Sequence, residues 1–364
     1  MSATTSRPVA APLSSPADQR VRPFASLLLG AAVMAALLSA CGGGKAGPAP
    51  TVTITQNASA SAPSSASAVA VTPPAIVAVT KSGALVTLNP ATGSVSSTLV
   101  ASHVLGDEIS VSSTGMVYFA VKKGCASEIE AVPAAGGTVA ELTSGSLPAV
   151  SPDGTKLAYA SQPTLTTGCI PSNPDLVPLY RLSIRTLSSG STVSLPMVPA
   201  GQDSGLPAPI THLSWAQDND HLAVSIAAVQ DNEGWNLNLV NTAQAPYYLS
   251  GTGVTSVPVT GSPTAQRSYL REGVYMPNGD LFVSRACCAG VPVHNTSRLM
   301  WEVNTSGVLV HQVAIGFANL DHVSLDVTSD GHWLLYLAGT SLYVSADGST
   351  PRELTTGLIA AAWG

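Results

Sequence analysis

Four cysteines in the body of the chain carry thiols that can react with one another. Cys125, Cys169, Cys287 and Cys288 each fall in a segment that we expect to connect a second strand to a third within a repeat. In an exported chain, an even number of cysteines indicates disulfide bonds. We expect Cys125 to pair with Cys169, because they occupy equivalent connections of neighbouring repeats. Cys287 and Cys288 then form a vicinal bridge or pair elsewhere.

The same region offers possible metal ligands. Cys287 and Cys288 with His294 would be soft ligands, but their spacing matches no standard zinc pattern, and oxidising surroundings favour disulfides over thiolates. Residues 231–233, Asp-Asn-Glu, could bind calcium weakly, yet clustered carboxylates in a loop are more often solvated. We therefore expect no metal and no other cofactor.

Signals for catalysis are sparse. No Gly-x-Ser-x-Gly elbow occurs, and the 7 histidines are scattered. His221 and His332 each begin an expected strand, where we predict a surface role beside a turn. Only seven arginines lie beyond residue 40, and they form no cluster. These observations favour a protein that is not an enzyme.

The N-terminus carries the signals of an exported protein. Arg20 and Arg22 precede an uncharged run at residues 23–40 that ends in small residues, as in a secretory signal peptide. The run ends in Leu38-Ser39-Ala40-Cys41, which resembles the lipobox of bacterial lipoproteins. This resemblance implies that the Cys41 thiol receives a diacylglyceryl group, that residues 1–40 are removed, and that lipid anchors the chain to the outer face of the cell membrane.

An uncleaved transmembrane helix is the alternative for residues 23–40. Eighteen uncharged residues are at the lower limit for a membrane span, and the three glycines after Cys41 disfavour a continuing helix. Under both interpretations the remaining chain lies outside the cytoplasm, because the arginines stay inside. Residues 41–73 are rich in Ala, Ser, Pro and Gly, which predicts a flexible tether.

Composition restricts both the partners and the fold. The formal charge is −6, and residues 41–364 alone carry −8. Because no basic stripe accompanies this charge, we exclude nucleic acid as a partner. Charged residues make up only 10% of the chain, which holds 32 Gly and 27 Pro, and this favours many short strands joined by turns.

A turn motif recurs between apolar segments of residues 74–364. The clearest copy is Ser151-Pro152-Asp153-Gly154, within residues 142–161. Pro presets the first turn position, Asp caps the turn and Gly accepts a positive φ, so the motif predicts a β-hairpin. Related turns occur at residues 111–115, 214–219, 275–279 and 327–331. In one of them Asn219, the next-best residue at positive φ, replaces Gly.

These repeats resemble the WD40-like (PD40) repeats of TolB-type β-propellers. The resemblance rests on residues 151–154, on the aliphatic-aromatic segment that follows, and on the Asp-Gly, Arg and Leu-Thr of residues 347–355. It implies an all-β propeller of four-stranded blades over residues 74–364. We expect the fold to carry over, and not TolB's role in envelope import.

Counting repeats predicts six blades, with seven as the alternative. Five complete blades are expected at about residues 107–143, 147–196, 211–250, 271–315 and 323–356. Three strands at residues 75–80, 84–88 and 94–100 precede them, and one strand at residues 358–363 follows. We predict that these pieces form the sixth blade, because closing the ring removes exposed sheet edges. Trp363 should then be buried.

Long connections predict where a partner would bind. Residues 162–177, 197–210, 252–267 and 286–297 join second to third strands or one blade to the next, and these two loop classes emerge on the same face of a propeller. Long loops on a rigid scaffold usually carry recognition, although insertions also accumulate wherever backbone is exposed.

We therefore expect a non-enzymatic binding or scaffold module for a protein, a peptide or a cell-envelope component. A hydrolase or oxidoreductase with a site at the channel mouth is the alternative, and a purely structural envelope protein is a third possibility. Acidic residues or histidines converging on the first strands would favour catalysis, whereas an apolar or Ser/Thr-lined channel would favour binding. The first strands at residues 147–151 and 212–215 are mostly uncharged, which favours binding.

Overall fold

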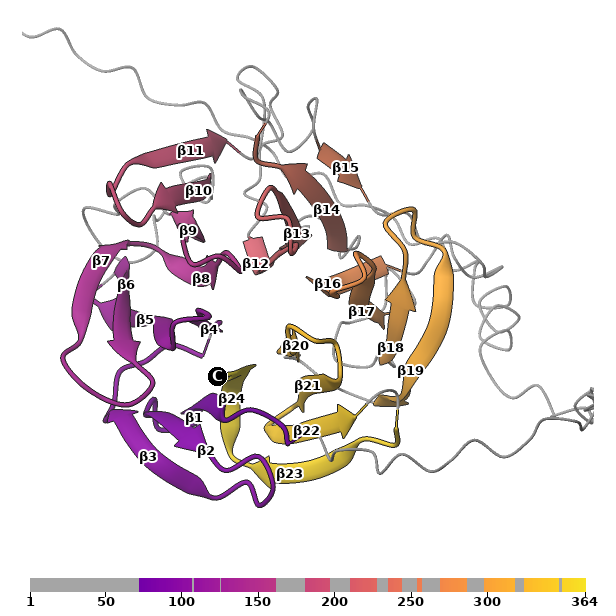
Figure 1. The fold of residues 1–364 in the computed structure, drawn as a ribbon, viewed down its shortest axis with the longest axis horizontal. Coiled ribbons are helices and arrows are strands. Elements are labelled where there is room, and N and C mark those ends of the chain that lie inside the picture. Colours follow the sequence, from indigo (N-terminus) through magenta and orange to yellow (C-terminus); the bar gives the residue numbers. More distant parts are fainter. Residues whose placement is uncertain are drawn as a thin grey trace, which may run out of the picture. The chain divides into compact units, whose positions relative to one another are not determined.

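The described part of the protein is built entirely from β-strands. The computed structural model describes residues 72–106, 108–124, 126–161, 181–196, 210–227, 235–243, 254–256, 269–286, 298–317, 324–346 and 349–364. Their strands form six sheets of four antiparallel strands each. These sheets are the blades of one ring (Figure 1), which confirms the predicted six-bladed propeller. No helix in these ranges is long and apolar enough to cross a membrane.

The blades follow one another along the chain, and we number them from the first complete one. Blade 1 comprises β4 (Ser110–Val111), β5 (Met116–Lys123), β6 (Ala126–Pro133) and β7 (Ala140–Ser144). Blade 2 comprises β8 (Ser146–Val150), β9 (Lys156–Ser161), β10 (Arg181–Thr186) and β11 (Thr192–Pro196). Blade 3 comprises β12 (Ile210–Trp215), β13 (His221–Ala227), β14 (Trp235–Asn241) and β15 (Val254–Ser256).

The remaining blades have the same four-stranded order. Blade 4 comprises β16 (Tyr269–Tyr275), β17 (Leu281–Ala286), β18 (Arg298–Val303) and β19 (Leu309–Phe317). Blade 5 comprises β20 (Leu325–Val327), β21 (Trp333–Ala338), β22 (Ser341–Ala346) and β23 (Arg352–Thr356). Blade 6 comprises β24 (Leu358–Trp363), β1 (Ile76–Thr80), β2 (Leu85–Leu88) and β3 (Val95–Val100).

Blade 6 closes the ring with strands from the two ends of the described chain, as predicted. β24 pairs antiparallel with β1, so that Trp363 lies opposite Ile76 and Ala361 lies opposite Ala78. Only 7% of Trp363 is exposed, which confirms that it is buried. The pairing covers an edge of β1 that would otherwise be free to pair with another chain.

The recurring turn forms the hairpin that its sequence predicts. Asp153 Oδ1 accepts hydrogen bonds from the Ser151 hydroxyl at 2.6 Å and from the Thr155 N–H at 3.0 Å. The Gly154 N–H then donates to the Ser151 carbonyl at 2.8 Å, with φ +70° at Gly154. Positive φ recurs at the corresponding Gly115, Asn219, Gly279 and Gly331. Asn219 therefore takes the place of glycine, as expected.

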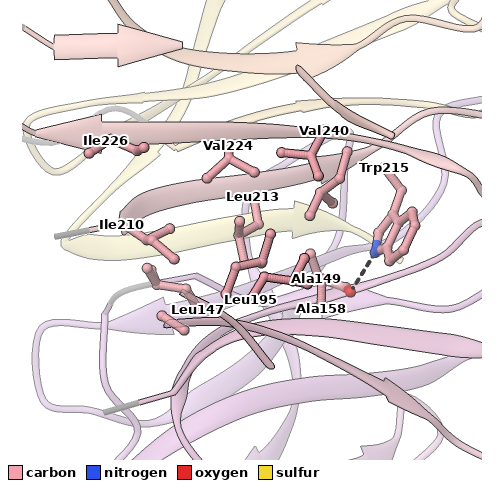
Figure 2. Close-up of a cluster of buried hydrophobic side chains, with 13 residues drawn as sticks. Leu147, Ala149, Ala158, Leu195, Ile210, Leu213, Trp215, Val224, Ile226 and Val240 are labelled. Carbon is pink, nitrogen blue, oxygen red and sulfur yellow. Dashed lines mark hydrogen bonds between the residues drawn. The ribbon is translucent and has the colours of Figure 1, made fainter. Parts of the chain in front are cut away.

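Six separate hydrophobic clusters form the core, one between each pair of neighbouring blades. Side chains alternate along a strand, so each blade contributes one set to each neighbour. In β1, Ile76 and Ala78 pack towards blade 5, whereas Val77 and Val79 pack towards blade 1. Figure 2 shows the cluster between blades 2 and 3, to which Leu147 of blade 2 and Leu213 of blade 3 both contribute.

One predicted boundary is wrong. We expected blade 3 to end near residue 250 and residues 252–267 to be an insertion. Its fourth strand is instead β15, in which Val254 pairs with Val240. The connection between β14 and β15 is therefore longer than in the other blades, and the short β-branched run at residues 254–256 supplies the strand.

Candidate functional site

A cavity of about 370 Å³ runs between the first strands of the blades. We call β4, β8, β12, β16, β20 and β24 the inner strands, because they lie nearest the centre of the ring (Figure 1). The chain around each of the six contributes to the lining, so the cavity is the axial channel of the propeller. Its lining is rich in hydroxyl groups, among them Ser112, Ser151 and Thr328.

Each inner strand is the edge of its sheet, so the backbone N–H and C=O groups on its unpaired side need hydrogen-bond partners outside the sheet. Side chains of neighbouring blades supply several of these partners. Ser110 Oγ accepts a hydrogen bond from the Val150 N–H at 3.0 Å, and Ser214 Oγ accepts one from the Tyr275 N–H at 3.1 Å. These bonds join blade 1 to blade 2 and blade 3 to blade 4.

The same link recurs between blades 5 and 6 with a carboxylate in place of a hydroxyl. Asp326 Oδ2 accepts a hydrogen bond from the Trp363 N–H at 2.8 Å, and Asp326 Oδ1 accepts one from the Val327 N–H at 2.8 Å. Burial raises the pKa of Asp326 to about 6, although the two N–H groups act in the opposite direction. Near pH 7 Asp326 is therefore mostly ionised.

The three linking residues occupy one position of the repeat, two residues before the hairpin turn. Blades 1, 3 and 5 carry Ser110, Ser214 and Asp326 there, whereas blades 2, 4 and 6 carry Ala149, Val274 and Ala362. Polar and apolar residues thus alternate around the ring. Blades 2 and 3 are joined differently, because the acceptor is a backbone carbonyl. Trp215 Nε1–H donates to the Ala149 carbonyl at 2.9 Å (Figure 2).

A carboxylate and an imidazole face each other in the channel, each two residues before the linking serine of its blade. Glu108, two residues before β4 begins, accepts a hydrogen bond from the Leu213 N–H through Oε2 at 3.2 Å. Its Oε1 lies 3.5 Å from His212 Nδ1. Both residues line the cavity, and 8% of Glu108 and 7% of His212 are exposed. Glu108 thus spans from blade 1 to blade 3.

Burial decides the charge of His212. It lowers the pKa of the imidazole to about 4, because a cation is poorly solvated there. The nearby Glu108 carboxylate favours the cation, but at 3.5 Å the attraction does not outweigh desolvation, and we take His212 to be neutral at pH 7. Its proton then belongs on Nδ1, facing the carboxylate. This leaves Nε2 as an acceptor, and Nε2 has no hydrogen-bond partner among the described residues.

Most residues singled out from the sequence lie outside the described residues. These are Cys41, Cys125, Cys169, Cys287, Cys288, His294 and residues 231–233. Their predicted lipid attachment, disulfide pairing and ligand chemistry therefore stay predictions. Within the described ranges, no three His, Cys, Asp or Glu side chains are grouped so that they could hold a metal ion.

The two histidines predicted to flank turns do so. His221 begins β13, and its Nδ1 lies 2.6 Å from Asp218 Oδ2 in the preceding turn. His332 precedes β21 and is exposed. Sequence reasoning missed Glu108 and Asp326, and it treated the strand that contains His212 as uncharged. Counting back from each hairpin turn would have aligned these residues at the channel positions of the repeat.

Comparison with known proteins supports the fold alone. No protein family matches the sequence, and no curated protein is similar to it. Among solved structures, TolB from Acinetobacter baumannii aligns at 13% identity with a TM-score of 0.53, over 79% of this chain and 65% of TolB. The chain therefore spans less than two thirds of TolB. The predicted likeness to TolB-type propellers is confirmed for the fold.

Two further structures align less closely. A chain of a nidogen/laminin complex aligns at 11% identity and a TM-score of 0.48, over 79% of this chain and 97% of that one. The tricorn protease aligns at 10% identity and a TM-score of 0.46, over 78% of this chain and 29% of the protease.

Proposed function

We propose that this protein is an exported lipoprotein, anchored to the outer face of the cell membrane through Cys41, whose propeller is a non-enzymatic binding module. The signal sequence at residues 20–41 supports export and acylation. The six-bladed propeller supports a binding role, because its rigid ring can present many loops at once. Its channel is rich in hydroxyl groups, as expected of a binding protein, and it also holds Glu108, His212 and Asp326, residue types that were expected to favour catalysis.

The observation that carries this proposal is the division of the propeller into two faces. The turn face holds the hairpin turns between first and second strands, such as residues 151–154. Because β1 starts opposite Trp363, at the end of β24, the chain before Pro74 joins the propeller at this face. A tether from Cys41 would therefore reach the turn face.

The opposite face, which we call the loop face, is where second strands end and first strands begin. Ser161, Ala227 and Ala286 end their strands there, and Ile210 and Tyr269 begin theirs. The connections at residues 162–180, 197–209, 257–268 and 287–297 join these strand ends. A partner that binds the loop face would contact the side of the ring opposite the point where the chain before Pro74 joins it. We propose a protein, a peptide or a cell-envelope component as that partner.

Affinity capture from intact envelopes tests this proposal. The bait is the full chain in detergent, compared with a variant in which residues 197–209 and 257–268 are replaced by short Gly-Ser linkers. These two connections contain no cysteine, so the predicted disulfides stay possible. We expect the variant to lose partners that the unaltered bait captures. Capture of the same partners by both baits would contradict the proposal.

A matched control changes the turn face instead. Ala135→Lys, Ser189→Lys and Ser306→Lys alter exposed residues in turns between third and fourth strands. This variant should capture the same partners as the unaltered bait, and thermal melting of all three proteins checks that each is folded.

The pair formed by Glu108 and His212 favours a second candidate function. A neutral imidazole whose Nδ1–H faces a carboxylate can accept a proton at Nε2, as a general base does. A hydrolase or oxidoreductase with its site in the channel is therefore the alternative. Turnover of an ester, amide or glycoside substrate that His212→Gln abolishes would establish it, and a fully active His212→Gln variant would remove His212 from any such role.

A further inference from the structure

The wall of the axial channel is polar on alternate blades. The polar side chains come from blades 1, 3 and 5 and form two levels, with Ser110, Ser214 and Asp326 at one level and Glu108, His212 and Ser324 at the other. Between them, blades 2, 4 and 6 line the cavity with apolar residues, Ala149, Val274 and Ala362. A ligand in the channel would therefore meet hydrogen-bonding groups and apolar surface in turn around its circumference.

The serines of this wall have donor capacity to spare. Ser110 Oγ accepts the Val150 N–H at 3.0 Å and Ser214 Oγ accepts the Tyr275 N–H at 3.1 Å. A hydroxyl that accepts one hydrogen bond still has its own proton to donate. Both serines are half-buried, and Ser324 adds a third half-buried hydroxyl to the cavity lining.

His212 adds an acceptor to the same wall. It is 7% exposed and lines the cavity, and its buried Nε2 has no hydrogen-bond partner among the described residues. Such an atom in a native protein calls for an explanation, and a ligand or an ordered water can supply the missing donor. The Nδ1 contact with Glu108 Oε1, at 3.5 Å, is longer than an ordinary hydrogen bond, so a small tilt of the ring can bring Nε2 to the channel surface.

A ligand with several hydroxyl groups matches this wall. A hydroxyl both donates and accepts, so it can pair with Ser110 and Ser214 as well as with His212 Nε2. These wall groups are neutral, and an ion that relied on them would give up its hydration for uncharged partners. The C–H groups between the hydroxyls of a sugar ring would pack against Ala149 and Val274.

The size of the cavity suits a small molecule. Ligand sites typically enclose about 300–1,000 Å³, and the channel cavity of about 370 Å³ falls at the lower end of that range. The ring of six inner strands fixes its walls, so such a site is largely formed before the ligand arrives.

From these observations we propose that the axial channel binds a small neutral sugar. Sugar hydroxyls accept hydrogen bonds from Ser110 and Ser214, and another donates to His212 Nε2. Recognition of this kind depends on hydrogen bonds and apolar contact, and it requires no charge on the ligand. The site lies among the inner strands, so it is tested independently of any partner at the loop face.

Isothermal titration calorimetry on the full chain, in a detergent without a sugar head group, tests the ligand class with two series. Cyclohexanol, cis-1,2-cyclohexanediol and myo-inositol share a six-carbon ring and carry an increasing number of hydroxyls. The second series sets the neutral D-glucose, D-galactose and maltose against the charged D-glucosamine and D-glucuronate. We expect myo-inositol to bind at least tenfold more tightly than cyclohexanol, and a neutral sugar to bind more tightly than both charged ones. Equal binding along the first series, tightest binding by a charged sugar, or no binding by any neutral sugar would overturn the proposal.

Variants test the residues with the neutral sugar that binds most tightly. Ser214→Ala removes a donor and His212→Leu removes the acceptor at similar size, and each should weaken binding at least tenfold. Ser214→Thr keeps the hydroxyl and should keep most of the affinity, and Ser189→Ala in an exposed turn should not change it. Thermal melting checks that each variant is folded, and if His212→Leu fails to fold, the two substitutions of Ser214 decide.

A spectroscopic readout separates direct contact from an effect on folding. The ¹⁵N resonance of His212 Nε2 should shift when the sugar is added and stay fixed when cyclohexanol is added. The resonances of His221, which lies beside a turn, should not move in either titration. Unaltered sugar affinity in Ser214→Ala and His212→Leu, or an Nε2 resonance that ignores the sugar, would mean that a water satisfies His212 and that the channel is no sugar site.

Discussion

Asp326 Oδ2 accepts a hydrogen bond from the Trp363 N–H at 2.8 Å, and this contact joins blade 5 to the strand that closes the ring. β24 is thus held on both sides, by the β1 ladder within blade 6 and by Asp326 from blade 5. The Trp363 side chain adds to the same junction, since its ring packs edge-on against Trp333 with centroids 6.5 Å apart. Closure of the propeller therefore depends on a few residues near the end of the chain.

Removing residues 359–364 should open the ring. The deletion removes most of β24, including the buried Trp363 and three buried alanines, and it exposes the edge of β1. Loss of a buried tryptophan alone costs about 3–5 kcal/mol, so we expect the melting temperature to fall by about 10 °C or more. Differential scanning calorimetry measures this, with deletion of Gly364 alone as the control. An unchanged melting temperature would show that the ring does not depend on β24.

Asp326 should make stability depend on pH in the direction opposite to most carboxylates. Its folded-state pKa of about 6 lies above the ordinary 3.8, so the folded state binds the proton more tightly than the unfolded state. The contribution of Asp326 to the free energy of unfolding should therefore decrease as pH rises from about 4 to about 7, whereas His212, whose folded-state pKa is lowered to about 4, contributes an increase over a similar range. Asp326→Asn should remove the Asp326 contribution, so the difference in unfolding free energy between this variant and the unaltered protein should change with pH. Urea unfolding between pH 4.5 and 7.5 measures it.

Asp153 provides the control of opposite sign. Hydrogen bonds from the Ser151 hydroxyl and from Thr155 lower the pKa of Asp153, so its stabilisation is present above its ordinary pKa and is lost as pH falls. Asp153→Asn should therefore leave the pH dependence above pH 4.5 as it is in the unaltered protein. Parallel curves for Asp326→Asn and the unaltered protein would show that another group causes the pH dependence.

The sequence alone predicted the architecture well, because short local sequence motifs determine where the strands and turns of this fold lie. Hairpin turns such as residues 151–154 fix where strands start, and the single strand at residues 358–363 could only be completed by the three strands before residue 101. The channel site was missed for the opposite reason. Glu108 and His212 are 104 positions apart in the chain, and only closure of the ring brings them within 3.5 Å.

The serine links between inner strands should each stabilise the ring measurably. Ser110→Ala and Ser214→Ala leave the Val150 and Tyr275 N–H groups without their acceptors, at a cost of about 1–3 kcal/mol each. The two links share no partner, so the double variant should lose about the sum. Chemical denaturation measures both, and Ser189→Ala in an exposed turn should change stability by less than about 0.5 kcal/mol. Costs equal to that control would mean that water replaces the hydroxyls.

The predicted disulfide between Cys125 and Cys169 should cross-link neighbouring blades. It would close a loop of about 45 residues, which in the chain-entropy account stabilises the fold by roughly 4 kcal/mol. Non-reducing peptide mapping should recover the two cysteines in one linked peptide. Cys125→Ser should lower the melting temperature as much as dithiothreitol lowers that of the unaltered protein. Free thiols at both positions in protein recovered from the envelope would disprove the pairing.

Acylation at Cys41 gives a prediction that also separates the lipoprotein from an uncleaved membrane helix. If the lipobox is processed, the mature chain begins at Cys41 and its N-terminal peptide carries a diacylglyceryl group. The intact mass should then lack residues 1–40. Cys41→Ser should abolish labelling by fatty acid and leave the precursor at full length, because the thiol that accepts the lipid is gone. A full-length, unlabelled protein in both forms would instead indicate that residues 23–40 span the membrane, since that segment needs no thiol to stay inserted.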